Sequence, residues 1–288
     1  MLPKNFDYYS PKDVEEALEL LSKSGDSKLL AGGQSLIPMM KLRLASPGTI
    51  IDLSRVKGLS GISHSRASVK IGSMERIAEL AASKEIASSL PALHDASLSI
   101  ADVQVRDMGT IGGNVANADP SNDMPVVVLA YNAKMHVLSK KGPRIEDADS
   151  FFTGPYSTKV NADEILTAIE FPISAARHGS AYSRLERRVG DYALAACAAY
   201  VELDSSGKCS NARISVSGIS GSALRLPEAE AELVGKLPSK AAISAASDKA
   251  RQFANIEDSY YASAEIKRLA TMHVVGESLE AAFKRAKK

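Results

Sequence analysis

Apolar residues recur at helical spacing shortly after the N-terminus, at Val14, Ala17, Leu18 and Leu21. This period predicts a helix that buries one face. Ser10 is a candidate N-cap for it and Pro11 suits the first turn, while Gly25 is the expected stop. The first twenty-five residues are therefore expected to hold one amphipathic helix.

Short apolar runs bounded by turn residues predict strands over residues 28–31, 49–53, 68–72, 134–139, 144–147 and 164–171. A short helical turn over residues 36–44 completes a small βαβ-like unit with the first two strands. Residues 75–98 predict a helix in pieces, restarted at Ser83 and at Pro91. Asp123 can cap a further helix.

The last third of the chain has a different pattern. Antiparallel strands are predicted over residues 180–188, 192–203 and 211–217, with a turn over 205–208. After Pro227 the chain is rich in Ala, Glu and Lys and predicts three helices. We therefore predict an α+β fold, divided into parts 1–55, 56–176 and 177–288.

Composition narrows the function. The 288 residues are 45% hydrophobic and 24% charged with a net charge of +1, which is typical of a soluble globular protein and gives no basic footprint for nucleic acid. No apolar run approaches the ~20 residues of a membrane span. The N-terminus lacks a secretory pattern, so a cytoplasmic location is expected.

The two cysteines, Cys197 and Cys209, cannot supply the four thiolates of an iron–sulfur cluster. A disulfide between them is possible but disfavoured in the cytosol, and unpaired thiols are the simpler expectation. The five histidines are scattered, with no helical pair at metal-ligand spacing. We therefore expect no metal site within this chain, and no acid–base pair demands a catalytic role.

The most unusual stretch covers residues 110–125 and contains two adjacent glycines, three Asn, two Asp and two Pro. Such a segment is poor as helix or strand and rich in groups that hydrogen-bond locally. Its glycines, Gly112 and Gly113, match a second pair, Gly32 and Gly33, which also follows an apolar run. Each pair alone could be an ordinary tight turn, but two of them suggest one long phosphate-bearing ligand held at two places.

The groups near these glycines are neutral. Gln34, Asn114 and Asn117 offer amides where Lys or Arg is common in phosphate sites. The chain has neither a Gly-x-x-x-x-Gly-Lys-Ser/Thr run nor a Gly-x-Gly-x-x-Gly run, which excludes the common triphosphate loop and the ordinary Rossmann fingerprint. A dinucleotide such as FAD, bound outside the Rossmann scheme, fits these observations.

Three motifs of the sequence resemble those of a known protein family. They are Ala-Gly-Gly-Gln-Ser-Leu-Ile-Pro-Met-Met-Lys-Leu-Arg-Leu from residue 31, Thr-Ile-Gly-Gly-Asn-Val-Ala-Asn-Ala-Asp-Pro-Ser-Asn-Asp from residue 110, and Arg-Arg-Val-Gly-Asp-Tyr-Ala-Leu-Ala-Ala from residue 187. Together they resemble the FAD-binding medium subunit of the molybdenum hydroxylases. That family includes aerobic carbon monoxide dehydrogenase, xanthine dehydrogenase and archaeal glyceraldehyde oxidoreductase, and the resemblance covers nearly the whole chain.

The resemblance implies a fold: a two-subdomain FAD-binding domain of the vanillyl-alcohol-oxidase (PCMH) type, followed by a small α+β C-terminal domain. It also implies a set of cofactor-binding residues. They are Ala31, Gly32, Gly33, Gln34, Ser35 and Leu36 around the diphosphate, Thr110, Ile111, Gly112, Gly113 and Asn114 on its other side, and Asn117, Asp123, Ile100, Ala101, Val105, Ile165, Leu166, Arg184 and Tyr192 along the rest of FAD.

Several of these residues have a simpler explanation. Asp123 can be a helix cap and nothing more. Tyr192 matches an aromatic that covers one flavin face in the family, but it can also be an ordinary aromatic of a strand. Arg184 stands where carbon-monoxide-type subunits commonly have a Lys that approaches the flavin, but it can also be a solvated charge. The apolar members would belong to the core of any fold.

The resemblance implies a role in electron transfer. The substrate would be oxidised at a molybdenum cofactor on a large partner subunit, and electrons would pass through two [2Fe-2S] clusters on a small partner subunit to FAD on this chain. The complex would be a dimer of heterotrimers. The alternatives are a stand-alone FAD-dependent oxidase on the same type of domain, and a nucleotide-binding or scaffold protein that has lost its flavin.

Overall fold

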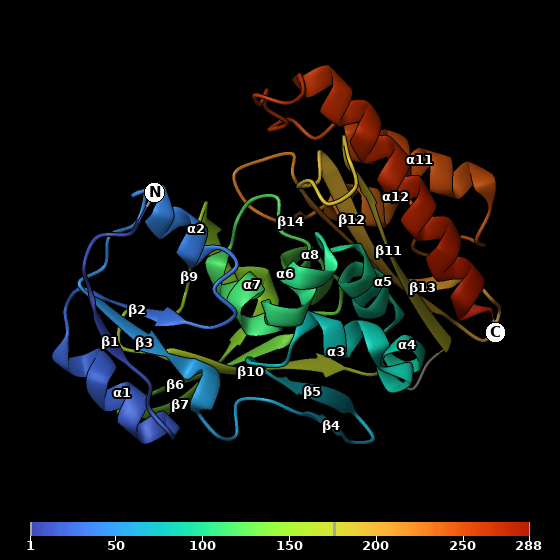
Figure 1. Ribbon diagram of the computed structural model, residues 1–288. Helices are drawn as coiled ribbons and strands as arrows, with labels where there is room; N and C mark the ends of the chain where they lie inside the picture. Colours follow the sequence, from blue (N-terminus) through green and yellow to red (C-terminus); the bar gives the residue numbers. More distant parts are fainter. Residues whose placement is uncertain (1, 175–176, 288) are drawn as a thin grey trace.

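The computed structural model describes residues 2–174 and 177–287. Within these ranges the chain is built around three larger sheets, which follow one another along the sequence, and a two-stranded sheet (Figure 1). The predicted α+β class is confirmed. The predicted boundary after residue 176 falls on residues outside the described ranges, as do the two chain ends at residues 1 and 288.

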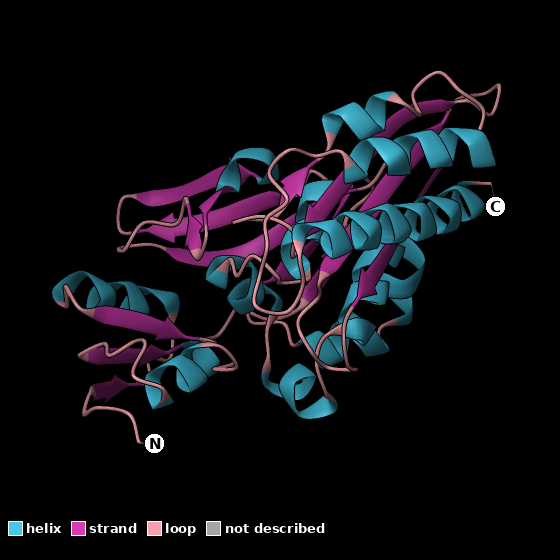
Figure 2. Cartoon of the chain, turned by 90° about the horizontal axis from the view of Figure 1, so that it is seen from above, coloured by secondary structure: helices cyan, strands magenta, loops and turns pink. Residues whose placement is uncertain are grey.

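The first sheet is parallel and has the order β1-β3-β2. Its elements are β1 (Asp7–Tyr9), α1 (Val14–Lys23), β2 (Ser27–Leu30), α2 (Leu36–Lys41), β3 (Thr49–Asp52) and the 3-10 helix η1 (Leu53–Arg55). The βαβ-like prediction is confirmed, although β1 had no clear sequence signal. Figure 2 shows this unit beside the larger body of the molecule.

Helix α1 begins later than Ser10 and Pro11 suggested. Asp13 is its N-cap, and the Asp13 side chain accepts a hydrogen bond from the N–H of Glu16. The first turn carries acidic side chains, which favours this start because the N-terminus of a helix is its positive end. Ala17, Leu18 and Leu21 are buried, as the helical period predicts.

The second sheet is antiparallel and has five strands, in the order β4 (Ile62–His64), β5 (Ser68–Gly72), β10 (Ile165–Pro172), β6 (Lys134–Ser139) and β7 (Gly142–Asp147). A small hairpin joins β8 (Phe152–Gly154) to β9 (Ser157–Thr158). Between β5 and β6 the chain forms six helices, α3 (Ile77–Ala82), α4 (Lys84–Ser89), α5 (Pro91–Ser99), α6 (Val103–Met108), α7 (Ile111–Asn117) and α8 (Met124–Ala130), and α9 (Ala148–Phe151) follows β7.

The predicted helix restarts are confirmed. Ser83 is the N-cap of α4 and accepts from the N–H of Ile86, and Pro91 is the first residue of α5. The prediction that residues 110–125 avoid regular structure is wrong. Thr110 caps α7 by accepting from the N–H of Gly113, and the helix ends at Ala118 in the left-handed conformation. This cap overcomes the low helix propensity of the two glycines.

The third sheet is antiparallel, in the order β11 (Arg177–Leu185), β12 (Ala195–Leu203), β13 (Cys209–Ser217) and β14 (Leu224–Arg225). Three helices follow, as predicted: α10 (Pro227–Ala231), α11 (Lys240–Arg251) and α12 (Ala264–Ala286). Helix α12 lies along this sheet (Figures 1 and 2). Strand β11 ends at Leu185 and β12 begins at Ala195, each three residues away from the predicted end, so residues 186–194 form a loop between them.

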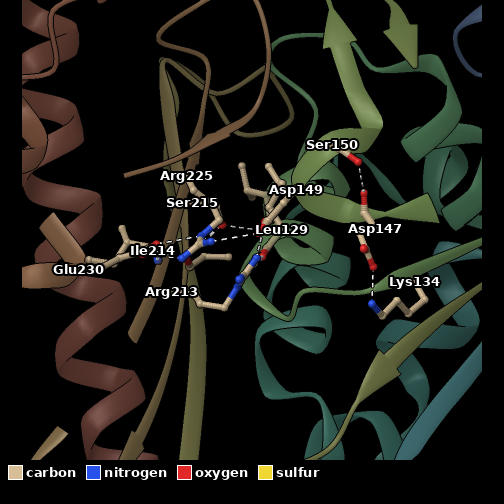
Figure 3. Close-up of polar contacts among 12 residues, drawn as sticks. Leu129, Lys134, Asp147, Asp149, Ser150, Arg213, Ile214, Ser215, Arg225 and Glu230 are labelled. Carbon is tan, nitrogen blue, oxygen red and sulfur yellow. Dashed lines mark hydrogen bonds and ion pairs between the residues drawn. The ribbon is translucent and has the colours of Figure 1, made fainter. Parts of the chain in front are cut away.

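Helix α8 joins the second and third parts, and all of its residues are buried. From β13, Ser215 donates a hydrogen bond to the carbonyl of Val126 at 2.5 Å. Arg213 reaches the end of the helix, where its Nε and Nη2 donate to the carbonyl of Leu129 at 3.1 and 2.8 Å, and it also pairs with Asp149 (Figure 3). Carbonyls at a helix C-terminus lack intrahelical partners, and the carbonyl of Leu129 also accepts from the N–H of Asn132 at 3.1 Å. The arginine therefore adds donors to the end of α8 from another sheet.

Cys197 on β12 and Cys209 on β13 are buried and unpaired. Burial raises the pKa of the Cys197 thiol to about 12 and that of Cys209 to about 11, so neither is a reactive thiolate near neutral pH. Within residues 2–174 and 177–287 no three His, Cys, Asp or Glu side chains are grouped as a metal site would require. None of the helices described has the length and apolarity to cross a bilayer.

Candidate functional site

A cavity of about 750 Å³ lies where the first sheet, the helices α6 and α7, and the 186–194 loop meet. This volume lies in the upper part of the range for ligand sites. Every residue predicted to bind the cofactor lines this cavity, except Ile111. They are Ala31, Gly32, Gly33, Gln34, Ser35, Leu36, Ile100, Ala101, Val105, Thr110, Gly112, Gly113, Asn114, Asn117, Asp123, Ile165, Leu166, Arg184 and Tyr192.

Ile111 lies instead in the hydrophobic core under α7, where its side chain is fully buried. Its backbone N–H donates to the carbonyl of Glu75 at 3.0 Å. Ile111 therefore holds α7 against the second part of the fold. Ile111 thus belongs to the glycine motif because its side chain packs into the core, and not because it lines the cavity.

The two glycine pairs lie next to each other. A Cβ added at Gly32 would stand 2.1 Å from the carbonyl oxygen of Met108, and one added at Gly113 would stand 3.2 Å from the Cβ of Ala31. A Cβ at Gly112 would collide with Ser73 at 2.4 Å. The sequence suggested that these glycines clear space for a ligand, but their missing side chains would meet protein atoms. A side chain at Gly32 would meet the backbone of residues 108–109, and one at Gly112 would meet Ser73, so these two glycines are needed for close packing against a neighbouring segment.

The backbone donors differ between the two segments. Among the described residues, no protein acceptor takes the N–H groups of residues 32–35, where Gly33 has a left-handed φ of 73°. On the α7 side the N–H of Gly112 donates to the carbonyl of Ser73 at 2.8 Å, and that of Gly113 to the hydroxyl of Thr110 at 3.1 Å. The turn at residues 32–35 is therefore the part that offers backbone N–H groups to an anion.

The side-chain amides of Asn114 and Gln34 also differ in whether protein groups already occupy them. The side-chain oxygen of Asn114 accepts from the N–H of Met124 at 3.3 Å, and its carbonyl accepts from Asn122 at 2.9 Å. The Asn114 oxygen is thus committed to positioning the start of α8. Within the described part of the chain, the Gln34 side chain makes one long contact of 3.4 Å, from Nε2 to the carbonyl of Gly32. Gln34 is accordingly the freer amide beside the unpaired backbone donors.

Asp123 is buried and faces the third part of the fold. Its carboxylate accepts from the hydroxyl of Tyr182 and from Nη1 of Arg184 at 3.1 Å, and it makes no capping bond to α8. The simple helix-cap interpretation is therefore wrong for the side chain. Burial raises the pKa of Asp123, and the Arg184 guanidinium acts in the opposite direction.

Arg184 is also buried, with 7% of its side chain exposed, so it is not a solvated strand charge. It donates to the carbonyls of Ser99, at 3.1 Å, and of Asp191, and it pairs with Glu186. Its Nε has no partner among the described residues, and neither does the buried hydroxyl of Ser73. Both residues line the cavity, so two buried polar groups are unsatisfied where a polar ligand would satisfy them.

The apolar lining is held rigidly on two sides. Leu166 belongs to the core of the second part, while Ile165 packs into the core of the first. At the other wall, Ala101 has a left-handed φ of 42°, and Arg106 donates to the carbonyls of Ile100 and Ala101 at 2.7 and 3.1 Å. A cavity with two fixed apolar walls and a few polar groups is the usual form of a cofactor site.

Sequence reasoning missed a second stretch of the wall, residues 156–162. Tyr156 and Asn161 lie there, after a Gly-Pro dipeptide that marks a turn but carries no chemical signature. Tyr192 is 58% exposed at the cavity, so it is not an ordinary strand aromatic. Burial raises the pKa of Tyr192, with a contribution from Asp119.

Comparison with known proteins gives a consistent result. The family described as "FAD binding domain in molybdopterin dehydrogenase" matches residues 4–174, and "CO dehydrogenase flavoprotein C-terminal domain" matches residues 180–282. The medium chain of carbon monoxide dehydrogenase from Afipia carboxidovorans is 43% identical over 244 residues, which cover 84% of each chain. That from Hydrogenophaga pseudoflava is 38% identical over 286 residues, or 99% of each chain.

Solved structures agree. A chain of the Hydrogenophaga pseudoflava carbon monoxide dehydrogenase superposes with a TM-score of 0.94 at 40% identity, covering 99% of both chains. A chain of quinoline 2-oxidoreductase from Pseudomonas putida 86 superposes with a TM-score of 0.93 at 29% identity, covering 100% of both. The similarity therefore extends over the full set of three sheets.

Proposed function

The chain belongs to the FAD-binding medium subunits of the molybdenum hydroxylases, and we propose that it carries electrons from iron–sulfur clusters on a partner subunit through FAD to an external acceptor. It is an oxidoreductase subunit with FAD as its cofactor. The observation that carries the proposal is the cavity closed by the two glycine segments, with unpaired backbone donors on one side. We place FAD there, on the residues predicted from the sequence, Ile111 excepted.

The residues around the cavity fit such a molecule. The N–H groups of residues 32–35 and the amide of Gln34 would hold the diphosphate without a cationic side chain. The buried Arg184 has a guanidinium nitrogen left to donate, and Ser73 a hydroxyl. Leu166 and Val105 would cover apolar parts of the cofactor. The flavin itself supplies the electron transfer chemistry, and the protein supplies its position and electrostatic surroundings.

The polar side chains around the cavity position its walls and do not act on a substrate. Thr110 and Ser73 fix α7, Asn114 fixes the start of α8, and Arg184 ties the 186–194 loop to Asp123. Each of these groups orients a wall of the cavity, and none forms an acid–base pair aimed at a substrate. We therefore propose that substrate oxidation takes place on another chain.

We propose two partners. A large subunit would hold the molybdenum cofactor, and a small subunit would hold two [2Fe-2S] clusters, with the complex a dimer of heterotrimers in the cytoplasm. Relatives support this assignment, because they are named as a medium chain or subunit of carbon monoxide, glyceraldehyde and nicotine-oxidising enzymes. The two buried cysteines of this chain are too few for a four-thiolate cluster.

The test is co-expression of this chain with candidate large and small subunits from the same genome. We expect substrate to reduce the clusters and then bleach the flavin absorbance of the complex. A complex assembled with Gly33→Val should still show cluster reduction but no transfer to an acceptor, because a branched side chain at the left-handed φ of 73° distorts the turn that would hold the diphosphate. The matched control is Gly58→Val, because Gly58 also has a left-handed φ, of 83°, an added Cβ there meets nothing within 4 Å, and the residue lies outside the cavity.

The alternatives give different results in the same experiment. A stand-alone oxidase would bleach its own flavin when the isolated chain meets an aldehyde, a purine or carbon monoxide, and this result would refute the electron-transfer proposal. A chain that has lost its flavin would purify colourless even when FAD is supplied. Acceptor reduction that persists in the Gly33→Val complex would also count against FAD as the exit for electrons.

A further inference from the structure

Tyr156 is an aromatic residue at the cavity that no sequence motif identified. It lies in the turn between β8 and β9, it lines the cavity, and 57% of its surface is exposed. An exposed tyrosine in a tight turn is usually mobile, because nothing restricts its rotamers. Tyr156 differs from that expectation because it is fixed at both its backbone and its hydroxyl.

The backbone of Tyr156 adopts a left-handed φ of 54°, which is costly for a residue with a large side chain. Its N–H donates at 3.0 Å to the carbonyl of Ala118, which has a left-handed φ of 48° itself. Two strained residues thus hold each other at the end of α7. Strain of this kind persists where the surrounding structure fixes it, and it gathers at ligand sites.

The hydroxyl of Tyr156 is anchored as well. It donates to Oδ2 of Asp119 at 2.9 Å, while Oδ1 of Asp119 accepts from the N–H of Ser121, also at 2.9 Å. The anchor is therefore part of a closed turn and has little freedom of its own. As a result the phenol ring is held with one position relative to α7, the helix that carries the second glycine pair.

Tyr156 also lies near Tyr192, the aromatic that the family resemblance assigns to one flavin face. Burial raises the pKa of Tyr156 to about 12, and Asp119 and Tyr192 contribute in the same direction. Two half-exposed aromatic rings, on loops from different parts of the fold, line the same cavity. Rigid aromatic side chains bind flat ligands with little entropic cost, because their positions are set in advance.

We propose that Tyr156 is a cofactor-contact residue, whose ring forms with Tyr192 an aromatic wall for the isoalloxazine end of FAD. This inference rests on the proposed location of FAD in the cavity. The turn at residues 155–156 would then have a binding role. Its sequence gives no sign of this role, and it lies outside both glycine motifs.

The test compares three variants of the full chain, reconstituted with FAD. Tyr156→Leu removes the ring, and Tyr156→Phe keeps it while losing the bond to Asp119. Tyr8→Leu is the matched control, because Tyr8 is 55% exposed and also donates to a carboxylate, Asp52, at 2.5 Å, but lies outside the cavity. The readouts are the FAD dissociation constant and the visible circular dichroism of the bound flavin.

We expect Tyr156→Leu to weaken FAD binding roughly three- to tenfold and to change the flavin dichroism, which is the scale of a stacking contact. Tyr156→Phe keeps the ring but loses its anchor, so its affinity should fall between those of the wild type and Tyr156→Leu, and Tyr8→Leu should be unchanged. Wild-type affinity and dichroism in Tyr156→Leu would overturn the inference while leaving FAD binding intact. A wild-type chain that takes up no FAD would overturn the proposed function itself.

A second measurement avoids any folding defect of the variants. Hydroxyl-radical footprinting of the wild-type chain, read by mass spectrometry, reports the exposure of each tyrosine with and without FAD. Labelling of Tyr156 should fall when FAD is added, and labelling of Tyr8 should not. Equal labelling of Tyr156 in the two states would contradict the proposed contact.

Discussion

Gly32→Ala should lower both the stability of the chain and its affinity for FAD, because the added methyl group has no room between the two glycine segments. A Cβ at position 32 would stand 2.1 Å from the carbonyl oxygen of Met108 and 2.7 Å from the Cα of Gly109. Both are main-chain atoms, so no side-chain rotation relieves the contact. Ordinary contacts begin at 3.4 Å, so one segment must retreat by about 1 Å.

The size of the effect follows from two terms. Forcing an extra methyl group into a packed site typically costs about 1–3 kcal/mol of unfolding free energy. Moving the N–H groups of residues 32–35 by about 1 Å stretches hydrogen bonds beyond the distance at which they form. Each such bond to a charged group contributes about 1.5–3 kcal/mol, so FAD should bind roughly ten- to a hundredfold more weakly.

Urea unfolding of the chain without FAD measures the first term, and titration of the chain with FAD, followed by flavin fluorescence, measures the second. Gly25→Ala is the matched control, since it lies in the same unit and an added Cβ there meets nothing within 4 Å. If Gly32→Ala matches Gly25→Ala in both measurements, the close approach of the two segments is not what the glycine is needed for.

Three further substitutions test other parts of the structure. Glu164→Gln should cost about 2 kcal/mol at neutral pH, because Glu164 accepts from Nε of Arg144 at 2.7 Å. Since hydrogen bonding to Arg144 lowers the pKa of Glu164, this contribution is complete above the unfolded pKa of about 4.3 and is lost as the pH falls through the folded value; a pH-independent difference in urea midpoints would contradict it. Tyr182→Phe should raise the pKa of Asp123 further and cost about 1–2 kcal/mol in thermal unfolding, and an unchanged melting temperature would count against the hydrogen bond. Arg213→Met keeps the aliphatic stem but removes the hydrogen bonds to the end of α8, so we expect the unfolding free energy in urea to fall by about 1.5–3 kcal/mol. A loss of less than about 0.5 kcal/mol would show that the contact is weak.

The fold was predictable wherever local chemistry decides it. The restarts at Ser83 and Pro91 appear in the structure, because an N-cap and a proline act within a single turn. The antiparallel strands of the third part appear for the same kind of reason, since alternation and a turn determine a hairpin. The start of α1 was misplaced by a few residues because Ser10 and Asp13 are both acceptable caps, and only the acidic first turn favours Asp13.

What the sequence could not reveal depends on contacts between distant residues. The helix at residues 111–117 forms because Thr110 caps it and Ser73 takes a backbone N–H, and Ser73 is far away along the chain. Asp123 has the signature of a helix cap, but its side chain is drawn to Tyr182 and Arg184 on another sheet. The glycines of both motifs line the cavity, while the reason for Gly32 and Gly112, close packing against a neighbouring segment, needed coordinates.

Helix α8 explains how the third part of the fold completes the cavity without contributing either glycine motif. At its N-terminal end, Asp123 accepts hydrogen bonds from Tyr182 and Arg184. At its C-terminal end, Arg213 donates to the carbonyl of Leu129 (Figure 3). Between them Ser215 binds the helix backbone. The third part is therefore fixed along the whole length of a buried helix, so its 186–194 loop reaches the cavity in one position. A ligand held by two segments of the first and second parts would then meet a third wall, which these contacts fix in place.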